Sequence, residues 1–187
     1  MPRMKVIMSP AVTLDGFIAN LDGECYSWIN PADEARYEKV REVGGCELVG
    51  RKTYEQYFDD FNSGRNVMTF VYTHQSRFTD TDKIKFIHGA GQEVLDQIAQ
   101  YGFSQLLFSG GGELNGLLAT AGVIDEIIVS IHAIVLGAGI PIFGSYKPSL
   151  KLKLLSTDQN VEGVVQNRYQ VIRQPGQAPA KSAHINL

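Results

Sequence analysis

Cysteine is scarce in this chain of 187 residues, which contains only Cys25 and Cys46. The two form neither a Cys-x-x-Cys pair nor a cysteine/histidine spacing typical of zinc sites, and the four histidines show no ligand spacing either. This scarcity excludes a disulfide-rich scaffold, and we expect no metal. It favours a reducing compartment, the cytoplasm, with a single Cys25–Cys46 disulfide left open as the alternative.

Long hydrophobic runs and a net positive charge are also missing. No apolar stretch approaches the roughly 20 residues of a membrane-spanning helix, and the first five residues are too polar to be expected as a signal peptide. The formal net charge of −3 gives no electrostatic reason to bind nucleic acid or an anionic membrane. We therefore expect a soluble cytoplasmic protein without nucleic-acid or membrane partners.

The chain does contain a regular alternation of apolar strand patterns and helical patterns. With 44% hydrophobic residues it can build one ordinary globular domain, which we place at 1–173. A tail at 174–187, rich in Pro, Ala, Gln and Gly, is expected to be disordered. Because the alternation ends in two β segments, the pattern predicts an α/β fold whose mixed, mostly parallel sheet ends in antiparallel C-terminal strands.

Individual elements follow from the same periodicities. We expect strands at 6–12, 47–50, 67–72, 83–87, 106–109, 127–131, 150–157 and 164–172. Helical spacing predicts helices at 31–43, 51–58, 94–101 and 113–121. Asn30 is the expected N-cap of the first helix, and Pro31 suits its first position.

Three consecutive glycines, Gly110, Gly111 and Gly112, join the expected strand 106–109 to a helical pattern. Glycine lets backbone approach a ligand, and the first turn of a helix offers unpaired N–H groups and partial positive charge. The combination predicts a seat for a phosphate group. A tight turn without a ligand is the alternative, and it is the more common case for a lone glycine cluster.

A second strand–glycine–helix junction lies at Gly50, followed by Arg51, Lys52 and Thr53. Neither junction matches a standard nucleotide motif. Lys52 lies one position later than the lysine of a P-loop, and the segment that begins at Gly110 misses G-x-G-x-x-G by one residue. A single phosphate needs only one junction. A pyrophosphate with an additional 2′-phosphate could occupy both.

Polar residues at the end of the expected strand 67–72 support such a ligand. Thr73, Ser76 and Arg77 follow that strand, and Arg51 with Arg77 could clamp a dianionic phosphate by bidentate hydrogen bonds. Ligands of α/β sheets bind beyond the carboxyl ends of the strands, so we favour this role over solvated surface arginines. With no nucleophile or metal pattern, a phosphate-rich cofactor that brings its own chemistry is the simplest fit.

Acidic candidates for a substrate site are fewer. Asp33 lies in the first turn of the helix expected at 31–43, where a carboxylate also commonly stabilises the helix dipole. Asp15 precedes Gly16 and is typical of a turn. Trp28 suits either a pocket wall or the core.

Five segments, in this order, resemble the dihydrofolate reductase superfamily. They are Ala11 with Leu14–Ala19, Trp28 with Asp33, Gly50–Glu55, Gly110–Leu114 and Val123–Glu126. The closer resemblance is to the C-terminal reductase domain of the bifunctional riboflavin-biosynthesis deaminase/reductase, and it covers about residues 4–173. It implies a three-layer dihydrofolate reductase-like fold and an NADPH-dependent reductase of a small nitrogen heterocycle, the pyrimidine 5-amino-6-(5-phosphoribosylamino)uracil in that branch.

The resemblance also implies roles for single residues in binding NADPH. Contacts to the pyrophosphate and 2′-phosphate would come from Gly50, Arg51, Lys52 and Thr53, and further pyrophosphate contacts from Gly110, Gly111, Gly112, Glu113 and Leu114. The adenosine end would lie on Thr73 and Arg77, and the nicotinamide on Ala11 and Ile18.

On the substrate side, the resemblance points to Asp15, Trp28, Asp33 and Ser109. A carboxylate five residues after a tryptophan binds the amino-pyrimidine ring in dihydrofolate reductases, and Asp33 follows Trp28 at that spacing, so Asp33 is the expected catalytic residue. Ser109 stands where riboflavin-type reductases carry a glutamate, and Gln56–Asp60 replaces their Asp-Asn-Pro.

These departures leave two alternatives to the pyrimidine reductase. One is a dihydrofolate or pteridine reductase that uses Asp33. The other, to which Ser109 points, is a non-catalytic NADPH-binding or sensing domain. The β-rich segment 127–144, together with the dimers common among related reductases, favours a homodimer.

Overall fold

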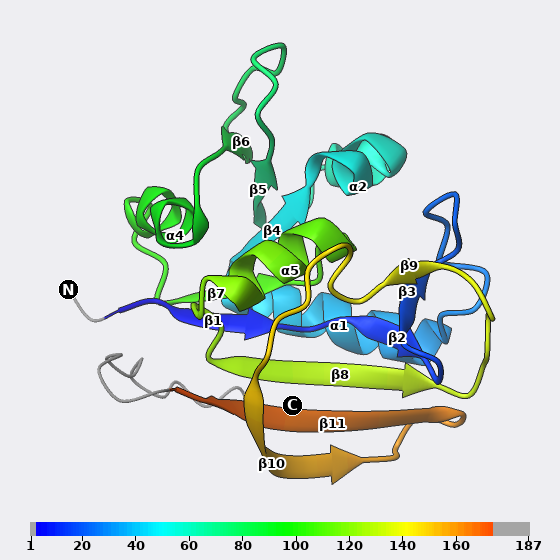
Figure 1. Cartoon of the computed structure of the whole chain (residues 1–187). Helices are drawn as coiled ribbons and strands as arrows, with labels where there is room; N and C mark the ends of the chain where they lie inside the picture. The colour runs from blue at the N-terminus through cyan, green and yellow to red at the C-terminus, as the bar shows by residue number, and fades with distance from the viewer. Residues whose placement is uncertain (1–2, 174–187) are drawn as a thin grey trace.

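The computed structural model describes residues 3–173 (Figure 1), so the expected disordered tail at 174–187 lies outside the described residues. The strands are β1 (Lys5–Met8), β2 (Ala11–Thr13), β3 (Phe17–Ala19), β4 (Cys46–Gly50), β5 (Met68–Tyr72), β6 (Ile84–Ile87), β7 (Gln105–Phe108), β8 (Glu126–His132), β9 (Ile140–Pro141), β10 (Lys151–Asp158) and β11 (Val164–Ile172). The helices are α1 (Pro31–Gly44), α2 (Arg51–Gln56), α3 (Phe58–Phe61), α4 (Gly91–Ala99) and α5 (Gly112–Thr120).

One large sheet organises the fold, with strand order β10-β11-β8-β1-β7-β4-β5-β6 and with β2 paired to β8. The pairs from β8 through β1, β7, β4 and β5 to β6 are parallel. The C-terminal hairpin β10–β11 joins β8 in antiparallel pairing along the lower edge in Figure 1. The prediction of a mixed sheet with antiparallel C-terminal strands is thus confirmed.

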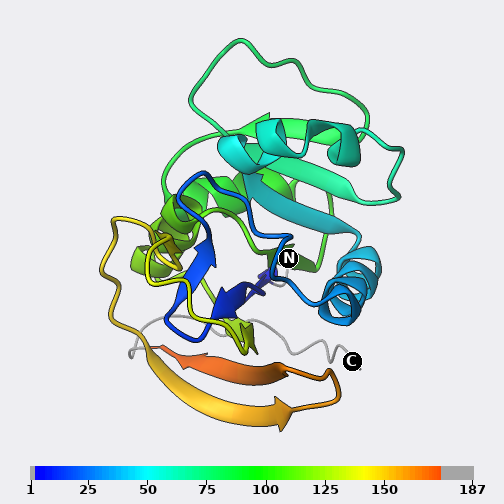
Figure 2. The same cartoon turned by 90° about the vertical axis from the view of Figure 1, so that its right-hand side faces the viewer.

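Helices cover both faces of this sheet. Successive side chains of a strand point to opposite faces, so β1 directs Val6 and Met8 into the main core under α4 and α5, and Ile7 into a smaller cluster under α1. A third cluster around Tyr54 packs α2 against β4, β5 and β6. Figure 2 shows α1 and α5 on opposite sides of the central strands, the three-layer arrangement that the sequence predicted.

Helix α1 begins and ends as its sequence predicts. The side chain of Asn30 accepts a hydrogen bond from the backbone N–H of Ala32 at 2.8 Å, and Pro31 occupies the first turn. Gly45 ends the helix in the left-handed region with φ 74°, donating to the carbonyls of Arg41 and Glu42. At 14 residues α1 is no membrane span, and none of the helices within 3–173 is long and apolar enough to cross a membrane.

Two local predictions were wrong, and one short strand was not predicted. The strand expected at 6–12 is divided into β1 and β2, because Pro10 between them has no N–H to donate to a sheet; its carbonyl accepts from the backbone of Ser130 at 3.0 Å and moves the chain onto β8. The helix expected at 51–58 ends at Gln56, where Tyr57 leaves the helical conformation with φ −114° and ψ 35°. The short strand β9 was not anticipated.

The contact between α4 and α5 leaves no room for a side chain at Gly91. A Cβ on this residue would overlap the Cβ of Ala121. We expect Gly91→Ala to lower the free energy of unfolding by about 1–3 kcal/mol, the usual cost of overpacking, as measured by urea denaturation. Gly50→Ala is the matched control, because a Cβ there would meet no atom within 4 Å; equal stability of the two variants would contradict the packing argument.

Candidate functional site

A cavity of about 790 Å³ opens where the parallel strands β1, β4 and β7 end. Its wall includes Ser9 after β1, Gly50 at the end of β4 and Ser109 after β7, together with side chains of α1. The carboxyl ends of parallel strands are the usual position of ligand sites in α/β sheets. The cavity therefore collects most of the residues that the sequence singled out.

The two glycine junctions lie next to each other in the wall of this cavity, because they follow the paired strands β4 and β7. Gly50 is the N-cap of α2 and Gly111 the N-cap of α5, and neither helix has a side-chain cap. Thr53 Oγ1 lies 3.7 Å from the position that a Cβ on Gly111 would take. First-turn N–H groups of both helices are therefore left to the cavity, and this arrangement fits a pyrophosphate.

The two candidate arginines also lie together, but a carboxylate joins them. Arg51 and Arg77 both form ion pairs with Glu55, one with each carboxylate oxygen. The sequence analysis did not anticipate this bridge, although the four-residue spacing of Arg51 and Glu55 on a helix was its signal. Arg51 and its neighbour Lys52 line the cavity. A phosphate bound there would meet a guanidinium group that Glu55 already orients.

At the second junction, Gly112 and Glu113 pack against the loop that follows β9. A Cβ on Gly112 would lie 2.5 Å from the carbonyl oxygen of Pro141, so only glycine fits under the loop that follows β9. The carboxylate of Glu113 accepts from the backbone N–H and the hydroxyl of Ser145, both at 2.8 Å. The predicted pyrophosphate contacts of these two residues can come from their backbone.

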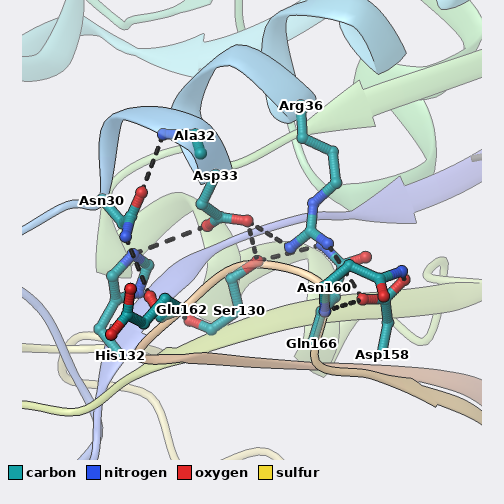
Figure 3. Close-up of polar contacts among 10 residues, drawn as sticks. All are labelled: Asn30, Ala32, Asp33, Arg36, Ser130, His132, Asp158, Asn160, Glu162 and Gln166. Carbon is teal, nitrogen blue, oxygen red and sulfur yellow. Dashed lines mark hydrogen bonds and ion pairs between the residues drawn. The ribbon is translucent and has the colours of Figure 1, made fainter.

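Asp33 is buried, with 5% of its surface exposed, and lines the cavity. Figure 3 shows its polar contacts. Its Oδ1 accepts a hydrogen bond from Ser130 Oγ at 3.0 Å and one from Arg36. His132 Nε2 lies 3.7 Å from its Oδ2. Arg36 also reaches Asp158 in the C-terminal hairpin at 3.7 Å. The carboxylate is therefore held in one orientation by α1 and β8.

The sequence analysis singled out only Asp33 in this network and missed its other members, Arg36, Ser130, His132, Asp158 and Gln166. Ser130 and His132 alternate on β8 and so face α1 together, and Gln166 Nε2 donates to Ser130 Oγ at 3.1 Å from the paired strand β11. Polar residues at alternate positions of an otherwise β-branched strand were the available signal. Trp28 packs edge-on against His132, with ring centroids 5.4 Å apart.

In the cavity wall, Ser109 contacts a second buried polar group. Its Oγ donates to Tyr37 Oη at 2.9 Å, and burial raises the pKa of this tyrosine above its usual range. Glu47, only 1% exposed, accepts from Thr69 Oγ1 at 2.9 Å. Burial raises the pKa of Glu47 as well, while the nearby Arg41 opposes the shift.

Four predicted site residues lie outside the cavity wall. Asp15 accepts from the backbone N–H of Gly137 at 2.8 Å and from Thr13 Oγ1 at 2.6 Å, which ties the β2–β3 turn to a distant loop. The others are Trp28, Thr73 and Arg77, whereas Ala11, Ile18, Asp33 and Ser109 do line the cavity. Of the described residues, no group of three His, Cys, Asp or Glu side chains is arranged to hold a metal ion.

Comparisons with known proteins now give this geometry a context. The family model described as RibD C-terminal domain matches residues 4–166. The uncharacterized protein YwjB of Bacillus subtilis (strain 168) is 28% identical over 168 residues, which cover 83% of this chain and 91% of YwjB.

Two solved structures share the fold. The diaminohydroxyphosphoribosylaminopyrimidine deaminase/5-amino-6-(5-phosphoribosylamino)uracil reductase of Thermotoga maritima superposes with a TM-score of 0.76 at 15% identity, over 91% of this chain and 57% of that one. For the dihydrofolate reductase of Enterococcus faecalis complexed with NADP(H), the TM-score is 0.67 at 16% identity, over 90% and 97% of the two chains. The predicted dihydrofolate reductase-like fold is thereby confirmed.

The two cysteine thiols differ in their position and in their expected reactivity. Cys25 lines the cavity, with Sγ 3.6 Å from Tyr57 Oη, and burial raises its pKa. Cys46 is a buried residue of β4, and burial raises its pKa to about 12. Because the thiolate is the reactive form, we expect Cys25 to react slowly with a thiol-exchange reagent at pH 8, its rate still rising above pH 9. Cys46 should react only on unfolding.

Single Cys25→Ala and Cys46→Ala variants assign each reaction to its residue. Two thiols that react in the folded protein as fast as in urea would contradict the burial of both.

Proposed function

The chain belongs to the RibD C-terminal domain family, and from this premise we propose that it is an NADPH-dependent reductase of a small nitrogen heterocycle. The observation that carries the proposal is the pairing of two uncapped helix N-termini, at Gly50 and Gly111, with the buried carboxylate of Asp33 in one cavity. The first two suit a dinucleotide phosphate, and the third suits a nitrogen-rich ring.

Cofactor binding is supported by the charge and backbone of one half of the cavity. Main-chain N–H groups after Gly50 and Gly111 would hold the pyrophosphate, and Arg51 with Lys52 would bind the 2′-phosphate. Ala11 and Ile18 also line the cavity and would flank the nicotinamide. The fold shared with a dihydrofolate reductase complexed with NADP(H) is consistent with this choice of cofactor.

The other half would bind and polarise the substrate. NADPH supplies a hydride when it is bound. Asp33 would accept hydrogen bonds from the ring and stabilise the positive charge that makes a C=N bond electrophilic. Arg36 and Ser130 hold its Oδ1 and so fix the direction of the remaining lone pairs. This prior orientation limits the reorganisation needed when a ring binds.

The ring itself is best supported as a pyrimidine of riboflavin biosynthesis. The family is named after a riboflavin-biosynthesis protein, and the Thermotoga maritima structure is a 5-amino-6-(5-phosphoribosylamino)uracil reductase. A dihydrofolate or pteridine substrate is the second candidate. Asp33 follows Trp28 by five residues and is buried, and a buried carboxylate can bind an amino-pyrimidine ring. A non-catalytic NADPH-binding or sensing domain is the alternative of another class.

A homodimer is also proposed. Leu152, Leu154 and Leu155 on the edge strand β10 are 40%, 54% and 45% exposed, an unusual amount of apolar surface for a strand edge. A second copy would cover this strand.

Cofactor choice depends on Arg51 in this proposal. We expect Arg51→Ala to weaken NADPH binding by roughly tenfold to a hundredfold, the loss of a charge-assisted hydrogen bond, and to change NADH binding less than about threefold. Quenching of the single tryptophan measures both constants. Lys39→Ala, an exposed residue of α1, is the control. If Arg51→Ala weakened the binding of NADPH and of NADH equally, the assignment of the 2′-phosphate to Arg51 would be wrong.

Turnover depends on Asp33. We expect Asp33→Asn to lower kcat by about a hundredfold to a thousandfold, as the loss of one preorganised charge contact does, with the Kd of NADPH unchanged. NADPH oxidation with the riboflavin-pathway pyrimidine and with dihydrofolate is the assay. Asp158→Asn is the matched control, because it also removes an acidic partner of Arg36 but lies outside the cavity wall.

If the Asp33→Asn variant kept its turnover, Asp33 would have no role in the reduction. Tight NADPH binding without reduction of either compound would favour the sensing domain.

A further inference from the structure

A second cavity, of about 480 Å³, adjoins the first beside α1. Seven residues belong to the walls of both: Tyr26, Glu34, Glu38, Arg41, Tyr57, Asp60 and Arg65. This acidic cavity, as we call it, therefore continues the first cavity between α1 and the segment that follows α2.

Both guanidinium groups in its wall are already neutralised. Arg41, which is 4% exposed, forms ion pairs with Glu38 and, at 3.5 Å, with Glu47. Arg65 forms an ion pair with Asp60 and lies 4.0 Å from Glu47. Neither guanidinium group therefore leaves an unbalanced positive charge in this wall.

The remaining charge of the wall is negative. Four carboxylates, those of Glu34, Glu38, Glu42 and Asp60, line the acidic cavity against the two guanidinium groups, a formal net charge of −2. Within residues 3–173, no ion pair joins Glu34 or Glu42 to a cation. Like charge disfavours a phosphate dianion here and favours neutral or cationic groups.

Two aromatic side chains make the acidic cavity suitable for an organic group. Tyr26 and Tyr57 both belong to its wall, and their rings pack edge to face with centroids 5.0 Å apart. Aromatic faces bind apolar or cationic groups, while carboxylates accept hydrogen bonds from hydroxyl and amino donors. The wall is therefore suited to a substituent of a substrate that carries hydrogen-bond donors and no negative charge.

We propose that the acidic cavity binds the arm that extends from the reduced ring of the substrate, and that this arm bears no phosphate. The inference rests on the proposed reductase function and narrows its substrate class to unphosphorylated, neutral or cationic heterocycles. In this respect the chain differs from the Thermotoga maritima reductase, which is named for a phosphoribosylamino substrate. Selection against phosphate arises because the four carboxylates of the wall outnumber its two guanidinium groups.

The test uses one matched pair of ligands: 5-amino-6-(5-phosphoribosylamino)uracil and the same compound after phosphatase treatment. Calorimetric titration into the full chain saturated with NADP⁺, at constant ionic strength, measures both affinities. We expect the unphosphorylated ligand to bind at least tenfold tighter. Equal or tighter binding of the phosphorylated ligand would overturn the proposal, and so would the absence of binding by both.

Two variants test the electrostatic cause. Asp60→Asn releases Arg65, and Glu34→Gln removes a carboxylate without breaking an ion pair, so each should raise the affinity of the phosphorylated ligand at least threefold. Asp59→Asn is the matched control, because Asp59 is exposed next to Asp60 but lines neither cavity. An unchanged affinity in both Asp60→Asn and Glu34→Gln would overturn the charge argument.

Oxidation of NADPH by the two ligands separates this inference from the proposed function. A calorimetric preference for the unphosphorylated ligand without any oxidation would count against the reductase activity alone. Oxidation that is faster with the phosphorylated ligand would support the reductase and overturn the acidic cavity as a selective site.

Discussion

Parallel pairing of β1, β7 and β4 is the interaction on which the site depends. It brings the carboxyl ends of these strands to one edge, where the chain turns into α2 after Gly50 and into α5 after Gly111. Residues about sixty positions apart in the sequence thereby present free backbone N–H groups to the same cavity. The order of the strands makes one site out of two short junctions, each of which would be a weak signal alone.

A second set of contacts holds Asp33 in place in the cavity wall. The carboxylate of Asp33 on α1 accepts from Ser130 on β8, and Arg36 extends the network to Asp158 on β10. The antiparallel hairpin is therefore coupled to the helix that bears the proposed substrate contact. Buried polar groups of this kind are costly unless each has a partner, which explains why the network spans three elements.

Charge along the cavity wall is uneven. Arg51 and Lys52 line it next to the helix N-termini, whereas α1 contributes the carboxylates of Asp33, Glu34 and Glu38 together with the guanidinium groups of Arg36 and Arg41. The first group suits a polyanionic cofactor, and the carboxylates of α1 suit a substrate that donates hydrogen bonds.

Much of this arrangement could be predicted because its signals are local. The strand–glycine–helix junctions, the N-cap at Asn30 and the hairpin β10–β11 follow from periodicity and turn chemistry within a few residues. The break of the first strand at Pro10 and the end of α2 at Gln56 were misjudged, since an apolar or helical pattern continues across both. The salt bridge from Glu55 to Arg77 joins residues that no short motif connects.

The sequence by itself determined the α/β class, the order of its elements and the residue types that suit a dinucleotide and a nitrogen-rich ring. Only the tertiary structure decided which of those residues share a cavity: it turned Asp15 and Trp28 away from the cavity wall and surrounded Asp33 with Ser130, Arg36 and His132. It also paired Arg41 and Arg65 with carboxylates. The physical reason is range, because periodicity and capping act within one turn or strand, whereas desolvation and ion pairing depend on what the fold brings alongside.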